Sequence, residues 1–115
     1  MDKEILENAG IDYAAGLLHF AGKEELYRKY LIKFKEDTHA DEGIMALDKG
    51  DYKEVLGQIH ALKGLSGTLG FSELFRKTSI VVAELREEKY ENLTRQLREI
   101  KQEQNRLLQV IGNER

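Results

Sequence analysis

Apolar residues recur at helical intervals along most of this chain, and no proline interrupts them. Residues three, four and seven apart share one face of an α-helix, so this periodicity predicts amphipathic helices that pack through their apolar faces. Such segments span 23–38, 51–69, 72–85 and 90–111, and Ile44 and Leu47 predict a further turn or two after His39. The run richest in β-branched residues, 79–82, lies inside one of these segments, so no strand is expected.

Polar residues and glycines mark where these helices should begin and end. Asp51 is a candidate N-cap, with Glu54 three residues later as its capping-box partner. Gly70 is expected to end the helix that follows Asp51, because glycine accepts the left-handed conformation found just after helix C-termini. Ser72 is then a candidate N-cap of the next helix.

The predicted fold is all-α: an antiparallel up-and-down four-helix bundle in which short turns connect neighbouring helices. A short extra N-terminal helix over 11–18, with Asp12 as its N-cap, is expected to cover one end of the bundle. A length of 115 residues suits one domain and is too short for two. We therefore expect a single helical bundle domain over 1–115, with its core over about 10–111.

The composition excludes several classes of function. With 18 basic and 21 acidic residues the net charge is −3, which is unlike the strong positive field of a sequence-independent nucleic-acid binder. The chain has no cysteine, so disulfides, thiol nucleophiles and cysteine-ligated metal sites are excluded. No apolar run approaches the roughly 18 residues of a membrane-spanning helix, and the charged N-terminus is unlike a signal peptide. We expect a soluble cytoplasmic domain that contacts neither nucleic acid nor membrane.

The helix expected over 51–69 carries an unusual polar face. On a helical wheel its apolar stripe centres on Ile59, and His60 falls outside that stripe. Glycines at 57, 64 and 67 share the face of His60, and Lys63 lies one turn along. Glycine inside a helix costs about 1 kcal/mol relative to alanine, so the three together cost about 2–3 kcal/mol. Glycines leave the helix surface around this imidazole without side chains, so another molecule could approach it closely. Binding of such a molecule would explain why the helix keeps three glycines that lower its stability.

Two structural explanations stand beside this functional one. The segment 64–67 is equally consistent with the end of a helix and the start of a loop. A single surface histidine often has no function at all. From the pattern alone, both explanations of His60 and its glycines stay open.

The run from His60 to Gly70 resembles the signature of histidine phosphotransfer (HPt) domains. In that family a histidine is followed by leucine at +2, lysine at +3, glycine at +4 and glycine at +10, and the chain matches all four. The matching residues are Leu62, Lys63, Gly64 and Gly70. The resemblance extends over roughly 10–111, is tightest over 51–86, and includes the segments 20–27, 50–51 and Phe34.

The resemblance implies a four-helix phosphocarrier of two-component phosphorelays. His60 would accept a phosphoryl group from a receiver-domain aspartate and pass it to another receiver. Lys63 and Gly64 would support the phosphoryl group, and Gly57 and Gly67 would flatten the surface on which the partner docks. The receiver would supply the aspartate and Mg²⁺, so the chain needs no cofactor or metal of its own. A parent hybrid histidine kinase is a second implied partner, and the chain would have no kinase activity.

One position departs from the family pattern. Many members carry Gln or Glu on the following helix, where its side chain hydrogen-bonds the second nitrogen of the histidine. The matching position here is Val82, which cannot make this bond. Thr78, Ser79 or a water molecule are the remaining candidates for orienting the imidazole, unless nothing does so.

The other histidines and the last helix offer alternatives. His19 is expected to be a packing or surface residue, and His39 is expected at a helix C-terminus, where positive charge is favourable. A metal site would need three distant segments to converge, and Asp51 and Glu54 lie two turns from His60. A non-catalytic helical adaptor, pairing through the heptad-like stripe of 93–111, is the alternative function. A four-helix enzyme is a third, but no convergent carboxylates support it.

Overall fold

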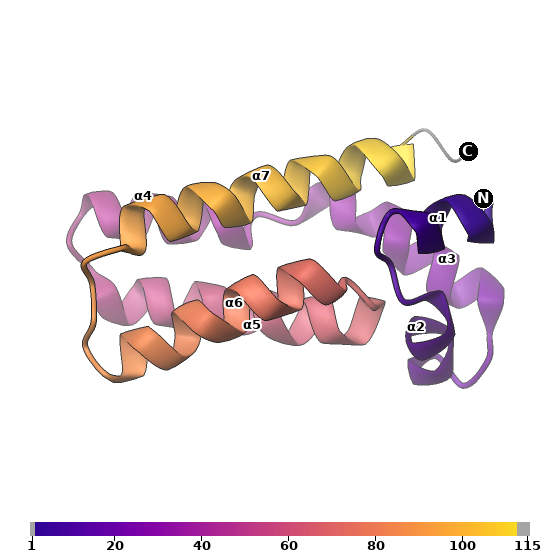
Figure 1. The fold of residues 1–115 in the computed structure, drawn as a ribbon, viewed down its shortest axis with the longest axis horizontal. Coiled ribbons are helices and arrows are strands. Elements are labelled where there is room, and N and C mark those ends of the chain that lie inside the picture. The colour runs from indigo at the N-terminus through magenta and orange to yellow at the C-terminus, as the bar shows by residue number, and fades with distance from the viewer. Residues whose placement is uncertain (1, 113–115) are drawn as a thin grey trace.

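The structure, a computed structural model, describes residues 2–112; the ends of the predicted domain, 1 and 113–115, lie outside this range. Within it the chain folds into α-helices and one 3₁₀ turn, with no β-strand (Figure 1). One isolated antiparallel bridge pairs Ile11 with Phe71. The elements are α1 (Lys3–Asn8), α2 (Tyr13–His19), α3 (Glu24–Lys33), η1 (Phe34–Glu36), α4 (His39–Asp48), α5 (Tyr52–Leu69), α6 (Ser72–Arg86) and α7 (Leu93–Gly112).

Helices α4 to α7 form an antiparallel four-helix bundle. Each packs against the next along the chain, and α4 closes the bundle against α7. Helices α1, α2 and α3 gather at the end of the bundle where α7 finishes (Figure 1). The molecule measures 40 × 24 × 21 Å along its principal axes. The all-α prediction is therefore confirmed. The first helix of the bundle is α4, however, and not the segment 23–38 that was expected in this place.

The helix predicted over 23–38 is broken in two. Helix α3 ends at Lys33, a 3₁₀ turn follows, and Asp37 adopts an extended conformation (φ −73°, ψ 130°). The Asp37 carboxylate then accepts a hydrogen bond from the backbone N–H of His39 at 3.2 Å, which starts a new helix. Aspartate favours such local bonds over a helix interior, so its side chain supports the break at this position.

Helix α4 is longer than the predicted turn or two, and its buried face is made of small residues. Ala40, Gly43 and Ala46 are buried there. A Cβ at position 43 would lie 3.1 Å from Ile59 Cδ1, so α4 approaches α5 closely at this point. Small residues give a weak hydrophobic periodicity, and for this reason the sequence underestimates α4.

Two of the three predicted N-caps are observed. Asp51 caps α5 by accepting from Glu54 N at 3.1 Å, but the Glu54 carboxylate accepts from Gln58 Nε2 instead of completing a capping box. Asp12 caps α2 in the same way, accepting from Ala15 N at 3.1 Å. The prediction for Ser72 is wrong by one position: Phe71 occupies the cap of α6 without a side-chain hydrogen bond, and Ser72 is the first helical residue.

Gly70 joins the extra N-terminal helix to the bundle. It ends α5 in the left-handed region, with φ at +82°. Its carbonyl accepts a hydrogen bond from Asp12 N at 2.7 Å. A Cβ at this position would collide with the Asp12 carbonyl oxygen, so only glycine lets the two backbones approach this closely.

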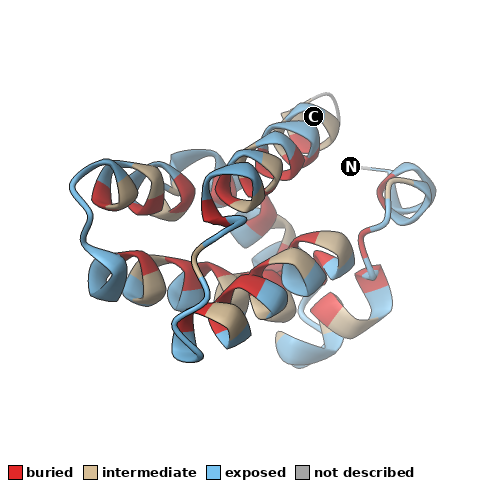
Figure 2. Ribbon diagram, turned by 60° about the vertical axis from the view of Figure 1, so that its left-hand side comes forward, coloured by how far each residue is buried: buried red, intermediate tan, exposed pale blue. Residues whose placement is uncertain are grey.

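The buried residues, red in Figure 2, lie along the inner faces of the helices. Every apolar member of the predicted α7 stripe is at most 2% exposed, and Gln104 within it is 1% exposed. Several aromatic members of the predicted stripes are only half-buried, however. These are Tyr30, Tyr52 and Phe75, which are 40%, 39% and 41% exposed. Leu6 of α1, which the sequence did not single out, is fully buried.

Candidate functional site

His60 lies midway along α5, and its side chain is exposed. The buried residues of α5 include Val55, Ile59 and Leu62, which all point to the bundle interior. The helical period then turns the side chain of His60 outward. Because the Asp51 cap and the αL residue Gly70 fix the two ends of α5, the imidazole stands on a rigid element.

The space around the imidazole is open on both sides along the helix. A Cβ added at Gly57 or Gly64 would meet no atom within 4 Å. Within residues 2–112 the His60 ring makes no hydrogen bond or ion pair with protein groups. Both ring nitrogens are therefore accessible to a reactant, and no intramolecular packing explains the glycines at 57 and 64.

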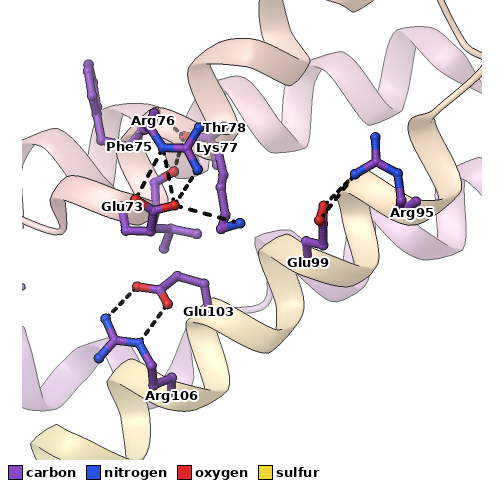
Figure 3. Close-up of polar contacts among 10 residues, drawn as sticks. Glu73, Phe75, Arg76, Lys77, Thr78, Arg95, Glu99, Glu103 and Arg106 are labelled. Carbon is purple, nitrogen blue, oxygen red and sulfur yellow. Dashed lines mark hydrogen bonds and ion pairs between the residues drawn. The ribbon is translucent and has the colours of Figure 1, made fainter. Parts of the chain in front are cut away.

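Lys63 lies one turn from His60 and is half-buried. Its ammonium is 5.9 Å from the centroid of the Phe75 ring on α6, at the outer limit of a cation–π contact. Among the residues described, no carboxylate lies within ion-pairing distance of Lys63, whereas Lys77 pairs with Glu73 (Figure 3). The Lys63 ammonium is consequently free to meet an incoming anion.

Gly67, expected on the docking surface, packs against a side chain of the same protein that leaves little room for a Cβ. A Cβ there would lie 3.2 Å from both Cδ1 and Cε1 of Phe75, tighter than ordinary van der Waals contact. The ring of Phe75 thus covers Gly67, and this glycine differs from the open Gly57 and Gly64. The sequence placed Phe75 in the core stripe of its helix, but the structure places the half-exposed ring against α5.

No described side chain orients the imidazole of His60. Val82, at the position where the HPt resemblance leads one to expect a hydrogen-bond partner, is buried in the core and 1% exposed. The Thr78 hydroxyl donates to the Leu74 carbonyl at 2.7 Å, and the Ser79 hydroxyl donates to the Phe75 carbonyl at 2.6 Å. Both hydroxyl protons are therefore used within α6, and neither residue bonds to His60.

The three histidines lie on three different helices. His19 is an exposed surface residue, one of its two expected roles, and its Nδ1 lies 3.1 Å from the Thr68 carbonyl oxygen. The prediction for His39 is wrong: it opens α4 rather than closing a helix, and its Nδ1 lies 2.6 Å from Asp37 Oδ1. In the part of the chain that the structure describes, no group of three His, Asp or Glu residues could hold a metal ion.

Sequence reasoning missed a shallow pocket beside the His60 face. Gly64, Gly67 and Phe75 form one side of it, and Ala15 and His19 of α2 form the other. The pocket joins segments about 50 residues apart, so no local pattern could have indicated it. It extends the open surface around Gly64 toward the end of the bundle.

The stripe on which the adaptor alternative rested belongs to the core. Leu93, Leu97, Ile100, Leu107 and Ile111 of α7 are all buried against the rest of the bundle. A helix whose apolar face is already covered offers no second heptad seam to a partner.

In the described range, none of the helices is both long and apolar enough to cross a lipid bilayer.

Comparisons of the chain with protein-family models, with curated proteins and with solved structures gave no match.

Proposed function

We propose that this chain is a phosphocarrier of the histidine phosphotransfer type, with His60 as the phosphoacceptor. The single observation that carries the proposal is an exposed imidazole on a rigid helix, between two helical glycines with open space above them. Among the described residues, this imidazole has no hydrogen-bond partner. An imidazole is nucleophilic near neutral pH, because it titrates close to that range. The match of the 60–70 segment to the HPt signature supports the same assignment.

The reaction we propose is a reversible phosphoryl transfer between a carboxylate and the imidazole. The lone pair of one His60 nitrogen attacks the phosphorus of an aspartyl phosphate on the partner. An N–P bond forms, the acyl O–P bond breaks, and the electron pair leaves with the partner's carboxylate. The other ring nitrogen keeps its proton and can exchange it with solvent, since no group within residues 2–112 holds it. The reverse reaction passes the phosphoryl group to a second aspartate.

Lys63 and Gly64 support the phosphoryl group in this proposal. The Lys63 ammonium, one turn from His60, would donate charge-assisted hydrogen bonds to phosphoryl oxygens. Gly64 would leave room for those oxygens beside α5, since no atom occupies the space of a side chain there. The chain contributes one nucleophile and one cation, and it neither makes nor hydrolyses a phosphoanhydride by itself.

The partner class follows from the HPt resemblance of the 60–70 segment. A receiver domain would bring the phosphorylated aspartate and the Mg²⁺ that neutralises the transferred group. A second receiver, or the parent hybrid histidine kinase, would take part in the same relay. We place this relay in the cytoplasm, as expected from the sequence.

The test of the proposal is transfer from phosphorylated receivers. A panel of receiver domains is charged with acetyl phosphate and Mg²⁺, freed of the small donor, and mixed with the chain. Label should leave at least one receiver and appear on the chain as an acid-labile, alkali-stable phosphoramidate. Stable complexes without transfer would instead support the adaptor, and release of phosphate alone would support an enzyme.

Lys63→Ala is expected to slow phosphoryl transfer, or to shorten the lifetime of phospho-His60, by about 1–3 kcal/mol in activation free energy. This is the range for a hydrogen bond to a charged group. Lys53→Ala is the matched control, because Lys53 is exposed on the same face two turns before His60. Equal rates and lifetimes in the two variants would reduce Lys63 to a surface residue.

Gly57→Ala is expected to combine a gain in stability with a loss of function. Alanine is the better helix former and meets no atom at this position, so the free energy of unfolding should rise by about 0.5–1 kcal/mol. The same methyl group stands where the receiver must approach, so transfer should slow, as expected when a functional face is suboptimal for folding. Chemical denaturation and the transfer assay measure the two effects.

The bulkier Gly57→Leu should weaken docking further without unfolding the bundle. Asn105→Leu, at an exposed position of α7, controls for an added surface leucine. Normal transfer by Gly57→Leu would place the docking surface elsewhere. If Gly57→Ala lowers stability, then Gly57 has a backbone role that the docking explanation does not include.

A further inference from the structure

We propose that Phe75 is a positioning residue, which holds the Lys63 ammonium at the phosphoacceptor face before a phosphoryl group arrives. The inference rests on the proposed function, since it assigns Phe75 a role only through Lys63. It adds a residue on α6, outside the signature segment, to the machinery around His60. The phosphoacceptor site would then be built from two helices rather than one.

The first observation is the placement of the Phe75 ring. It is a large apolar side chain that stays 41% exposed, although its neighbour Leu74 is fully buried. The ring leans across α5 and covers Gly67, where a Cβ would lie 3.2 Å from two ring atoms. Figure 3 shows the side chain pointing away from the ion pairs of α6 and α7. Gly67 thus makes room for a ring that would otherwise stand in solvent.

The second observation is the pairing of this ring with Lys63. The Nζ atom lies 5.9 Å from the ring centroid, and the negative face of an aromatic ring attracts a cation over this distance. No carboxylate competes for the ammonium within residues 2–112. Glu73, two residues before Phe75, is held by Arg76 and lies within 3.8 Å of Lys77. Its pKa is lowered, chiefly by the hydrogen bond from Arg76.

This arrangement suits a lysine that must receive a dianion. A lysine held by a carboxylate would have to break that ion pair before it could bind the phosphoryl group. An aromatic face restrains the flexible side chain more weakly and leaves the ammonium protons unneutralised. The charge-assisted hydrogen bonds to a phosphoryl group are stronger, so Lys63 can exchange one partner for the other. Restraining the side chain beforehand reduces the entropy that it loses on binding.

The contact itself is tested by NMR, independently of any phosphoryl chemistry. The ε-methylene protons of Lys63 should show an upfield ring-current shift in the wild-type chain. Phe75→Leu keeps an apolar side chain but removes the aromatic face, so the shift should disappear. Phe75→Tyr keeps the face, so the shift should remain. A Lys63 spectrum unchanged by Phe75→Leu would overturn the proposal.

The effect on the reaction is tested with phosphoramidate, a small donor that bypasses any receiver. Phe75→Leu should reduce the rate of His60 phosphorylation, or the lifetime of the phosphohistidine, about two- to fivefold, the equivalent of an exposed cation–π contact. Phe75→Tyr should restore the wild-type values. In a Lys63→Met background, Phe75→Leu should have no further effect, because a positioning residue acts only through the residue it positions.

The outcomes separate this inference from the proposed function. If His60 of the wild-type chain takes no phosphoryl group from either donor, the proposed function fails, and the inference fails with it. If His60 is phosphorylated normally but Phe75→Leu matches the wild type, only the inference fails. An equal effect of Phe75→Leu with and without Lys63 would also overturn it, since the ring would then act through packing alone.

Discussion

Replacing His60 with glutamine is expected to abolish phosphoryl transfer to the chain, leaving no acid-labile, alkali-stable label. The glutamine amide has no nucleophilic nitrogen to replace the imidazole, so the loss should be complete rather than graded. Because His60 is exposed and makes no hydrogen bond within the described residues, the fold should be unaffected. The free energy of unfolding should stay within about 0.5 kcal/mol of the wild-type value.

His19→Gln and His39→Gln are the matched controls for this variant. His19 contacts the Thr68 carbonyl, and His39 is paired with Asp37, so both histidines have structural partners that His60 lacks. Both control variants should accept the phosphoryl group as the wild type does. Label retained by His60→Gln, or lost in one control variant while the fold is intact, would move the acceptor away from His60.

Gly70→Ala should cause the largest loss of stability, about 2–3 kcal/mol in the free energy of unfolding. Alanine in the left-handed region costs about 1–2 kcal/mol, and Gly70 has φ at +82°. The new methyl group would also collide with the Asp12 carbonyl oxygen. Relieving this collision would break the Asp12 N–Gly70 O hydrogen bond of 2.7 Å and cost about 1 kcal/mol more.

Gly50→Ala separates the two contributions. Gly50 also has positive φ, at +69°, but a Cβ there would meet no atom within 4 Å. The free energy of unfolding of Gly50→Ala should therefore fall only by the cost of placing alanine in the left-handed conformation, about 1–2 kcal/mol. Urea denaturation of both variants measures the difference, which reports the close approach of α2 to the end of α5. Equal losses would mean that the Asp12 contact adds nothing to stability.

The sequence predicted the long helices of the fold better than the break between two of them. The long stripes of 51–69 and 93–111 predicted their helices well, because large apolar residues recur there at a strict period. The break at Asp37 escaped prediction, since the apolar period of Tyr27, Leu31 and Phe34 continues up to it. The Asp37 side-chain bond to His39 N competes with a continued helical backbone at this point, and apolar periodicity carries no signal of it.

The candidate site also has features that the sequence predicts and features that depend on how the helices pack. The exposure of His60 follows from helical geometry alone, since its position lies off the stripe centred on Ile59. The contact between Lys63 and Phe75 depends on how α6 leans against α5, which no local pattern specifies. The role of Gly67 was missed for the same reason. Its neighbour is a ring from another helix, whereas Gly57 and Gly64 face open space.

The most direct test of the central claim is to locate the phosphoryl group on the chain after mixing with a phosphorylated receiver. Phosphorus-31 NMR should show one phosphoramidate resonance, and tandem mass spectrometry under alkaline conditions should place the phosphoryl group on His60. Chasing with a second, unphosphorylated receiver should remove the resonance. A phosphoryl group on another residue, or none on the chain when the receiver has lost its own, would contradict the account.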